Sequence, residues 1–130
     1  MDVELRPWVE ADAGAAAAGD DRLFGAFLDG QVVGAGGLHR RIGPRALDLG
    51  YWVHAAYLRR GIATAIARRL CAIAFAEPAI GRVEIRHDPR NEPSGAVARA
   101  ARFEPLPDPD AAGHRVWRLD RSGSLDMESV

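Results

Sequence analysis

The stretch Tyr51–Ala65, with the sequence YWVHAAYLRRGIATA, decides how this 130-residue chain is interpreted. An apolar run ends at Val53, two arginines and a glycine follow at 59–61, and apolar residues at helical spacing begin at Ile62. That order predicts a strand, a turn and the start of a helix. The first N–H groups of a helix have no partner within it, so this helix start, with two cations beside it, suits a phosphate group.

The residues around this stretch predict an α/β domain. Asp29-Gly30 separates two apolar runs and is a strong signal for a two-residue hairpin. The order is β, short α, β-hairpin, β, α, β, α, β, which predicts a mixed sheet, antiparallel early and parallel around the long helix. The expected strands are 3–6, 23–28, 31–38, 46–53, 82–87 and 115–119, and the expected helices are 10–18, 61–76 and 94–102.

Composition narrows the class of protein. The chain has 17 basic and 18 acidic residues, so no global positive field exists to attract nucleic acid or anionic lipid, and we expect neither as a partner. All the basic residues other than histidine are arginine, which together with many alanines indicates a bacterial, GC-rich coding sequence. There is no secretory signal and no segment of membrane-spanning length, so we expect a cytoplasmic protein.

Cysteine and the possible metal ligands add two expectations. Cys71 is the single cysteine, which excludes an internal disulfide. It falls in a helical pattern, so we interpret it as a small buried residue rather than a reactive thiol. The histidines and carboxylates show no ligand spacing, and no metal site is predicted.

The turn itself offers both backbone and side-chain donors. Gly61 lets the backbone approach a ligand, and Arg59 and Arg60 could each make bidentate contacts with phosphate. The N–H donors would come from Ile62, Ala63 and Thr64. The stretch is neither a P-loop nor a dinucleotide fingerprint. On these residues alone, phosphate binding and an ordinary basic turn before a helix both remain open.

The flanking motifs carry a resemblance. Asp48–Val53 followed by Leu58–Thr64 resembles the acetyl-CoA signature of GNAT-fold N-acetyltransferases. Downstream, Val83–Arg86 and then Asp88–Ser94 are similar to the Asn-x-x-Ser segment of the RimJ/RimL-like branch, which acetylates ribosomal protein N-termini. The spacing from Ser94 to Phe103, the early segment 5–8 and the segment 37–41 fit the same branch. The resemblance runs from Asp2 to Phe103.

The resemblance implies a single GNAT-like domain over residues 1–120, followed by a polar tail over 121–130 that we expect to be frayed. It also implies acetyl-CoA as co-substrate. The turn Arg59–Thr64 would cradle the pyrophosphate, and Trp52 and Val53 would pair with the pantetheine arm. Asn91 and Ser94 would line that arm further along.

The implied reaction is direct attack of an amine on the thioester. A backbone N–H near Val53 would stabilise the oxyanion, and Ser94 would donate to the departing thiolate. Asp48 is our candidate for the base, directly or through water; a solvated strand carboxylate is the equal alternative. An imidazole suits the same role, so His39, His54 and His87 stay as alternatives, but each is interpreted first as a surface or strand-end residue.

The chain departs from the family pattern mainly on the acceptor side. Leu58 stands where Arg or Gln is usual, and Arg102 replaces the glycine before Phe103. The region between the first helix and the hairpin is short, and residues 104–114 are compressed. Three functions therefore remain: an acetyltransferase with an open site for a peptide N-terminus or small-molecule amine, a CoA-binding regulatory or interaction module, and a subunit completed by a partner chain. Exposed apolar surface would favour a homodimer.

Overall fold

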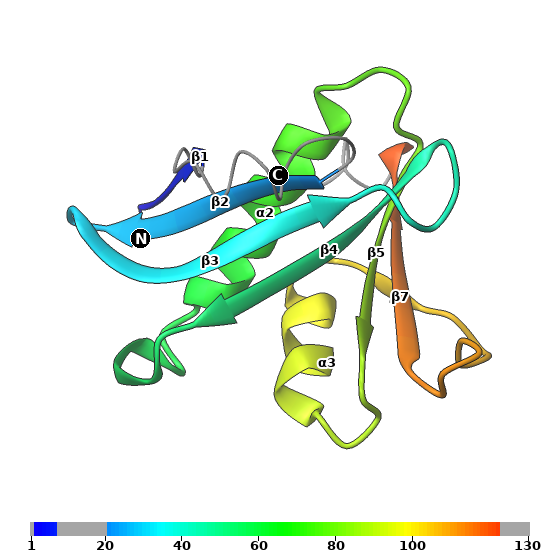
Figure 1. The fold of residues 1–130 in the computed structure, drawn as a ribbon. Helices are drawn as coiled ribbons and strands as arrows, with labels where there is room; N and C mark the ends of the chain where they lie inside the picture. Colours follow the sequence, from blue (N-terminus) through cyan, green and yellow to red (C-terminus); the bar gives the residue numbers. More distant parts are fainter. Residues whose placement is uncertain (1, 8–20, 123–130) are drawn as a thin grey trace.

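The computed structural model describes residues 2–7 and 21–122 of the chain. In these ranges, seven strands form one mixed sheet in the order β1-β2-β3-β4-β5-β7-β6 (Figure 1). The strands are β1 (Val3–Pro7), β2 (Asp21–Leu28), β3 (Gln31–His39), β4 (Ala46–Val53), β5 (Arg82–His87), β6 (Glu104–Pro105) and β7 (Arg115–Asp120). The helical segments are η1 (Ala55–Tyr57), α2 (Ile62–Phe75) and α3 (Glu92–Ala100).

The six expected strands are confirmed, and only the short β6 was not predicted. Asp29 and Gly30 both have positive φ, 52° and 79°, as the predicted tight hairpin between β2 and β3 requires. The long helix and the helix after Pro93 are also confirmed, each within two residues of its expected ends. The predicted helix over residues 10–18 and the position Trp8 lie outside the described residues.

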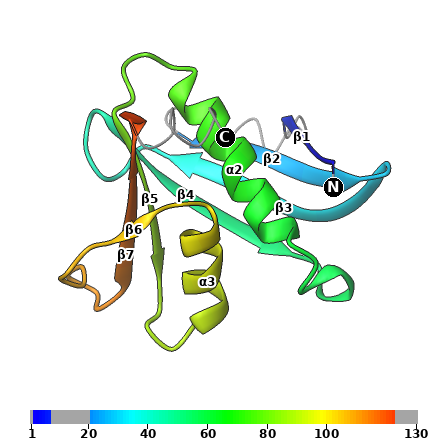
Figure 2. The ribbon, with the colours of Figure 1, turned by 180° about the vertical axis from the view of Figure 1, so that it is seen from behind.

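The β4 and β5 strands are the parallel pair of the sheet, and they separate halfway along their length. Pairing runs from Ala46↔Arg82 to Leu49↔Ile85 and then stops, although β4 continues to Val53. Beyond that point the two strands diverge, and both views show α3 in the V between them (Figures 1 and 2). The carboxyl end of β4 therefore has an open edge toward α3.

The hydrophobic core lies between the sheet and α2, which crosses one face (Figure 2). Alternate residues of β4, such as Leu47 and Leu49, point to this face, and Ile66 and Leu70 of α2 are fully buried against it. Gly36 on β3 makes room for the helix, since a Cβ there would come within 2.7 Å of Leu70. We call this the helix face of the sheet.

The opposite face of the sheet is polar over β5 and β7, and no described helix covers this face. One row of ionisable side chains crosses six neighbouring strands, because each residue is the cross-strand partner of the next. The row consists of Glu104, Arg118, Glu84, Asp48, His39 and Asp21. We call this the polar face.

The segment after β7 was expected to be a frayed tail from residue 121, but Arg121 itself is held by hydrogen bonds. Arg121 donates to the carbonyl oxygens of Phe75, Glu77 and Ile80, at 3.0, 2.9 and 2.6 Å, and so binds the C-terminal end of α2. A cation at the end of a helix is favourable because the last carbonyls carry partial negative charge. Within residues 2–7 and 21–122, no helix is long and apolar enough to span a membrane.

Candidate functional site

A groove of about 550 Å³ runs along the helix face from the end of β4 to the start of α2. Its walls come from β4, from the turn before α2 and from α3, so it lies between the end of β4 and α3. We call it the helix-face groove. It is lined by Tyr51, Val53, Tyr57, Leu58, Arg59, Gly61, Ile62, Ala63, Thr64, Pro93, Ser94, Ala96, Val97 and Ala100.

The N-terminus of α2 opens into this groove without a cap. Gly61 precedes the helix with φ 77°, a left-handed conformation that glycine adopts without strain. Among residues 2–7 and 21–122, no side chain accepts from the first turn. Ala65 is the first residue whose N–H bonds back into the helix, to the Gly61 carbonyl at 3.1 Å. The N–H groups of residues 61–64 therefore remain available, and together with the helix dipole they favour an anion.

The two arginines of the turn lie differently. Arg59 lines the groove and has φ 63°, which is uncommon for a residue other than glycine and is typical of functional turns. Arg60 does not line the groove; its guanidinium lies over the Tyr57 ring, 5.4 Å from the centroid. Arg59 is therefore the better placed of the two to contact an anion at the helix start.

The end of β4 presents unpaired backbone groups to the groove. The His54 N–H donates to the Val33 carbonyl at 2.7 Å, so the polar groups of His54 point toward β3. Backbone groups alternate between the two edges of a strand, so those of Val53 point the other way, toward the space where β5 has diverged. An N–H in this position can donate to an oxygen of a bound thioester.

Two hydroxyl groups meet in the groove where α3 faces β4. The Tyr51 hydroxyl donates to Ser94 Oγ across a long 3.4 Å. Burial raises the pKa of Tyr51, and the hydrogen bond with Ser94 offsets part of this rise, so the phenol stays a donor at neutral pH. Asn91 is the N-cap of α3, and its Oδ1 accepts from the Ser94 N–H at 3.3 Å. Asn91 holds the first turn of α3 and does not line the groove.

Trp52 and Asp48 lie on the polar face, away from the helix-face groove. Trp52 is 55% exposed and alternates with Tyr51 and Val53 along β4. Asp48 is only 7% exposed, so the alternative of a solvated carboxylate is wrong. Its Oδ2 accepts from Arg41 Nε at 2.9 Å, and its Oδ1 lies 3.5 Å from Arg86 Nη1.

A second groove, of about 390 Å³, lies on the polar face behind the first. Gly37 and Gly50 form its floor, and Leu23, His39 and Trp52 are among its walls. Gly50 and Tyr51 belong to the stretch of β4 that borders the V, so the two grooves lie on opposite faces of the same strand end. We call the second groove, the one on the polar face, the polar-face groove.

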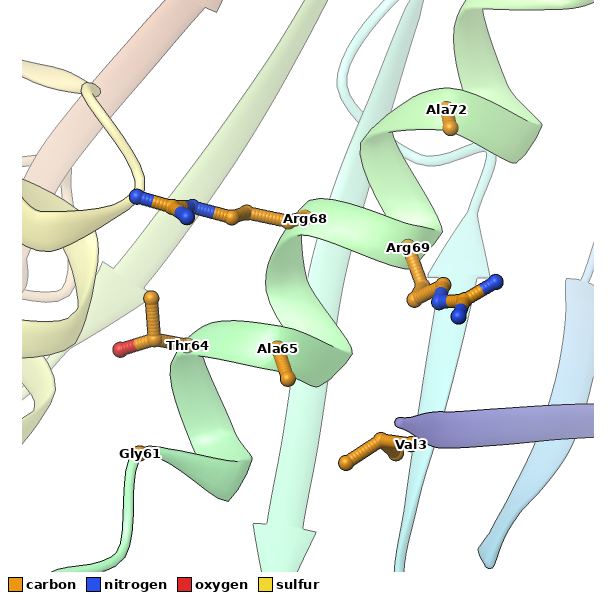
Figure 3. Close-up of a pocket in the computed structure, with 7 residues that line it drawn as sticks. All are labelled: Val3, Gly61, Thr64, Ala65, Arg68, Arg69 and Ala72. Carbon is orange, nitrogen blue, oxygen red and sulfur yellow. The ribbon is translucent and has the colours of Figure 1, made fainter. Parts of the chain in front are cut away.

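A third hollow, of about 430 Å³, continues from the turn along the outer side of α2 (Figure 3). It shares Gly61 and Thr64 with the helix-face groove. Figure 3 shows Arg68 reaching from the helix toward α3 on one side and Arg69 reaching toward β1 on the other. Arg68 donates to the Ala100 carbonyl at 3.0 Å, and Arg69 lies 3.4 Å from Asp2 Oδ1.

The sequence-predicted cofactor residues are thus brought together only in part. Seven of them line the helix-face groove: Val53, Arg59, Gly61, Ile62, Ala63, Thr64 and Ser94. Tyr51 and Tyr57 were not predicted as site residues, because an aromatic residue in a strand or turn is ordinarily a packing residue. The alternation along β4 already placed Tyr51 on the same face as Val53 and could have revealed it. Within the described ranges, no three His, Cys, Asp or Glu side chains form a cluster able to hold a metal ion.

Comparisons with known proteins agree with this geometry. The family described as an acetyltransferase (GNAT) domain matches residues 2–104. Among solved structures, aminoglycoside acetyltransferase AAC(6')-Ib in complex with coenzyme A superposes with a TM-score of 0.75 at 17% identity, covering 88% of this chain and 75% of that one. No curated protein matches the sequence.

Two further structures are ribosomal-protein acetyltransferase relatives. Mycobacterium smegmatis RimJ, in complex with CoA-disulfide, has a TM-score of 0.73 at 26% identity, covering 85% of this chain and 59% of that one. RimL, described as a ribosomal L7/L12 alpha-N-protein acetyltransferase in complex with coenzyme A, has a TM-score of 0.74 at 18% identity, covering 86% and 70%. At 17% and 18% identity, the AAC(6')-Ib and RimL structures support the fold alone.

Proposed function

The chain belongs to the acetyltransferase (GNAT) domain family, and from this premise we propose that it transfers the acetyl group of acetyl-CoA to a primary amine by direct attack. The observation that carries this proposal is the helix-face groove, which joins an uncapped helix N-terminus to an open strand edge. The first feature suits a pyrophosphate and the second suits an extended amide chain. Coenzyme A carries these two groups in that order.

Acetyl-CoA fits the grooves in one direction. The pyrophosphate lies on the N–H groups of residues 61–64 beside Arg59, and the pantetheine arm runs along Val53 toward Ser94. The nucleotide end then continues from Gly61 and Thr64 into the hollow along α2, where Arg68 and Arg69 offer positive charge to its 3′-phosphate. Arg60 supports the turn through its contact with Tyr57.

The chemistry needs three groups, and the site supplies candidates for each. The amine nitrogen forms a bond to the thioester carbon, and the carbonyl oxygen becomes an oxyanion that the Val53 N–H can stabilise. When the C–S bond breaks, the thiolate takes a proton from Ser94, whose hydroxyl oxygen accepts a hydrogen bond from Tyr51. The proton of the amine goes to a base.

The acceptor amine enters through the polar-face groove, because the helix-face groove is filled by the co-substrate. Among similar structures, one is named for aminoglycosides and one for the N-terminus of a ribosomal protein, and both kinds of acceptor carry primary amines. The shortened acceptor side leaves room for a peptide N-terminus as well as for a small molecule.

Two measurements test the proposal in sequence. Acetyl-CoA titrated into the protein by calorimetry should show saturable binding, and a lack of heat at high micromolar protein would contradict every CoA-dependent function. Release of free CoA thiol with a panel of peptides and small-molecule amines should then exceed hydrolysis without amine. Saturable binding without amine-dependent release would instead support the alternative, a CoA-binding regulatory or interaction module.

The location and assembly of the protein follow from the same proposal. A cytoplasmic protein of a bacterium fits a reaction that consumes acetyl-CoA and a chain rich in arginine and alanine without lysine. A GNAT-like unit over residues 1–120 is consistent with the match over 2–104, although Arg121 contacts it as well. A homodimer would cover exposed Trp52 or Val32, and light scattering at several concentrations tests it.

A further inference from the structure

We propose that His39 is the general base that accepts the proton of the attacking amine, and that Asp21 positions its imidazole. This inference rests on the proposed acetyltransferase function. It differs from the expectation of the sequence, which favoured Asp48 as the base and treated His39 as a strand-end residue. The imidazole of His39 lies in the polar-face groove beside Asp21, whereas Asp48 is engaged in ion pairs with two arginines.

The imidazole of His39, on β3, lies level with the point along β4 where β5 diverges from it. His39 is the cross-strand partner of Asp48, but its ring leans over Gly37, where a Cβ would come within 2.9 Å of Nε2. Gly37 in turn pairs with Gly50, the first residue of β4 beyond the last pair with β5. Gly37, Gly50 and His39 all line the polar-face groove, so Nε2 lies in this groove, level with the point where β5 leaves β4.

The ring is part of the polar-face groove, together with Gly50 and Trp52. Its side chain is 17% exposed, which limits its motion while leaving it open to a ligand. Among residues 2–7 and 21–122, no hydrogen bond involves Nε2. Glycine at position 37 is needed for this arrangement, because any larger residue would push the ring out of place.

Asp21 supplies the orienting charge. Its Oδ1 lies 3.0 Å from His39 Nδ1, although the contact is poorly aligned and Nδ1 has no well-directed hydrogen bond among the described residues. A carboxylate at this distance favours the tautomer with the proton on Nδ1, which leaves the lone pair of Nε2 facing the groove. The same carboxylate would stabilise the imidazolium formed when Nε2 accepts a proton.

Asp48 is occupied by structural contacts. Both of its oxygens face guanidinium groups, from Arg41 and Arg86, and accepting a proton would give up one of these ion pairs. The charged groups around His39 are Asp21 on β2, Asp48 on β4 and Arg41 in the turn after β3. Among the described residues, Nε2 of His39 has no hydrogen-bond partner and its ring lines the polar-face groove. The three charged groups around it do not line this groove.

In the proposed step, the amine nitrogen attacks the thioester carbon and transfers its proton to Nε2 of His39. The C–N bond forms and the C–S bond breaks, and the thiolate takes the hydroxyl proton of Ser94. Ser94 regains a proton from the Tyr51 hydroxyl, and Tyr51 regains one from solvent. The imidazolium then returns its proton to solvent through the polar-face groove. No further reactant is required.

The test compares His39→Ala with wild-type protein by amine-dependent release of CoA thiol. General acid–base catalysis contributes on the order of 10²-fold or more, so kcat should fall by about 10²-fold while the acetyl-CoA dissociation constant stays unchanged. Added imidazole should restore part of the lost turnover of His39→Ala, which a purely structural role would not allow. His39→Gln, with similar bulk, should be equally slow and should separate loss of the base from loss of packing.

Two more variants sharpen the result. Asp21→Asn should lower kcat less than His39→Ala does, and it should change the acid side of the pH profile of kcat/KM. His114→Ala removes a partly exposed histidine of the β6–β7 connection and should leave turnover and the pH profile unchanged. In His39→Ala, the acid limb of the pH profile of kcat/KM should disappear.

The outcomes distinguish failure of the His39 assignment from failure of the acetyltransferase function on which it rests. Turnover of His39→Ala equal to that of wild type, or no rescue by imidazole, would overturn the base assignment and leave the acetyltransferase function standing. Wild-type protein that binds acetyl-CoA but acetylates no amine would overturn both.

Discussion

At the scale of single residues, the turn before α2 separates two arginines that the sequence presents as equivalent. Arg59 adopts a left-handed φ and lines the groove, whereas Arg60 lies over Tyr57. The difference arises because consecutive residues in a tight turn point to different sides. In the proposed anion site, backbone N–H groups and Arg59 contact the phosphate, and Arg60 supports the turn.

We predict that Arg59→Glu weakens acetyl-CoA binding by about tenfold or more, because it loses a charge-assisted contact of about 1.5–3 kcal/mol and adds repulsion. Arg60→Glu should weaken binding less. Calorimetry measures both, and Arg115→Glu on the exposed edge of β7 is the control of equal charge. An Arg59→Glu affinity equal to that of wild type would refute the pyrophosphate assignment.

Cys71 illustrates a residue whose chemistry is suppressed by its position. It is fully buried in α2, and burial raises the pKa of its thiol to about 12. The thiol should therefore not react with a disulfide reagent at pH 8 in the native protein, and it should react fully in denaturant. Rapid native labelling would show that α2 opens locally. The slow reaction also keeps thiol release assays for CoA free of background.

At the scale of elements, α3 depends on a clamp that reaches it from β5 and β7. The Trp117 indole N–H donates to His87 Nε2 at 2.9 Å, so the proton of the ring lies on Nδ1, which donates to the Asp88 carbonyl at 2.7 Å. A Cβ on Gly95 would lie 3.6 Å from the His87 and Trp117 rings, an ordinary van der Waals distance, so α3 packs close to this pair. Gly95 follows Ser94, so His87 and Trp117 lie beside the turn of α3 that carries the proposed Ser94 donor.

We predict that Trp117→Phe lowers the free energy of unfolding by about 1–3 kcal/mol, because His87 loses its buried donor. Urea unfolding measures this change. Trp52→Phe, which alters an indole that is 55% exposed, should leave stability almost unchanged. Equal stability of Trp117→Phe and wild type would mean that the clamp contributes nothing to folding.

The outer side of α2 offers a separate test of how the co-substrate lies. If the 3′-phosphate binds between Arg68 and Arg69, Arg68→Gln and Arg69→Gln should each weaken CoA binding by about 3- to 10-fold, in keeping with partly exposed charge-assisted contacts. Neither variant should change the affinity for dephospho-CoA, which lacks that phosphate. The same loss for both ligands would show that these arginines act only on the fold.

At the scale of the whole molecule, ion pairs of buried carboxylates on the polar face link neighbouring strands of the sheet. Asp48 and Glu84 are direct neighbours on the parallel pair, and two carboxylates there would repel each other. Arg86 lies between them, 2.8 Å from Glu84 Oε1 and 3.5 Å from Asp48 Oδ1, and Arg82 and Arg118 also reach Glu84. The two carboxylates and their arginines therefore act as one network.

We predict that Glu84→Ala lowers the free energy of unfolding by about 3–5 kcal/mol, because it leaves partly buried arginines without their anion. Urea unfolding of Glu84→Ala and of Glu104→Ala makes the comparison. Glu104 ends the same row but is exposed, and its removal should cost less than about 1 kcal/mol. Similar losses for the two variants would contradict a cooperative network.

The sequence alone predicted most of the fold, because its signals are local. The strand β4 and the strand β5 have the expected bounds, since an apolar strand ends where turn residues begin. The hairpin at Asp29-Gly30 and the helix from Ile62 follow equally from short-range rules. The two-residue strand β6 could not be predicted, because it depends on pairing with β7 and not on its own pattern.

The candidate site divides in the same way. The uncapped helix start at Gly61 is a local feature, and the sequence by itself determined it together with the strand that leads to it. Only the tertiary structure decided which side chains share a space: that two arginines pair with Asp48, that Asp21 faces His39, and that Tyr51 meets Ser94. These relations depend on strand register and on where β4 and β5 part, which join residues far apart in the chain and leave no pattern in the sequence of either strand.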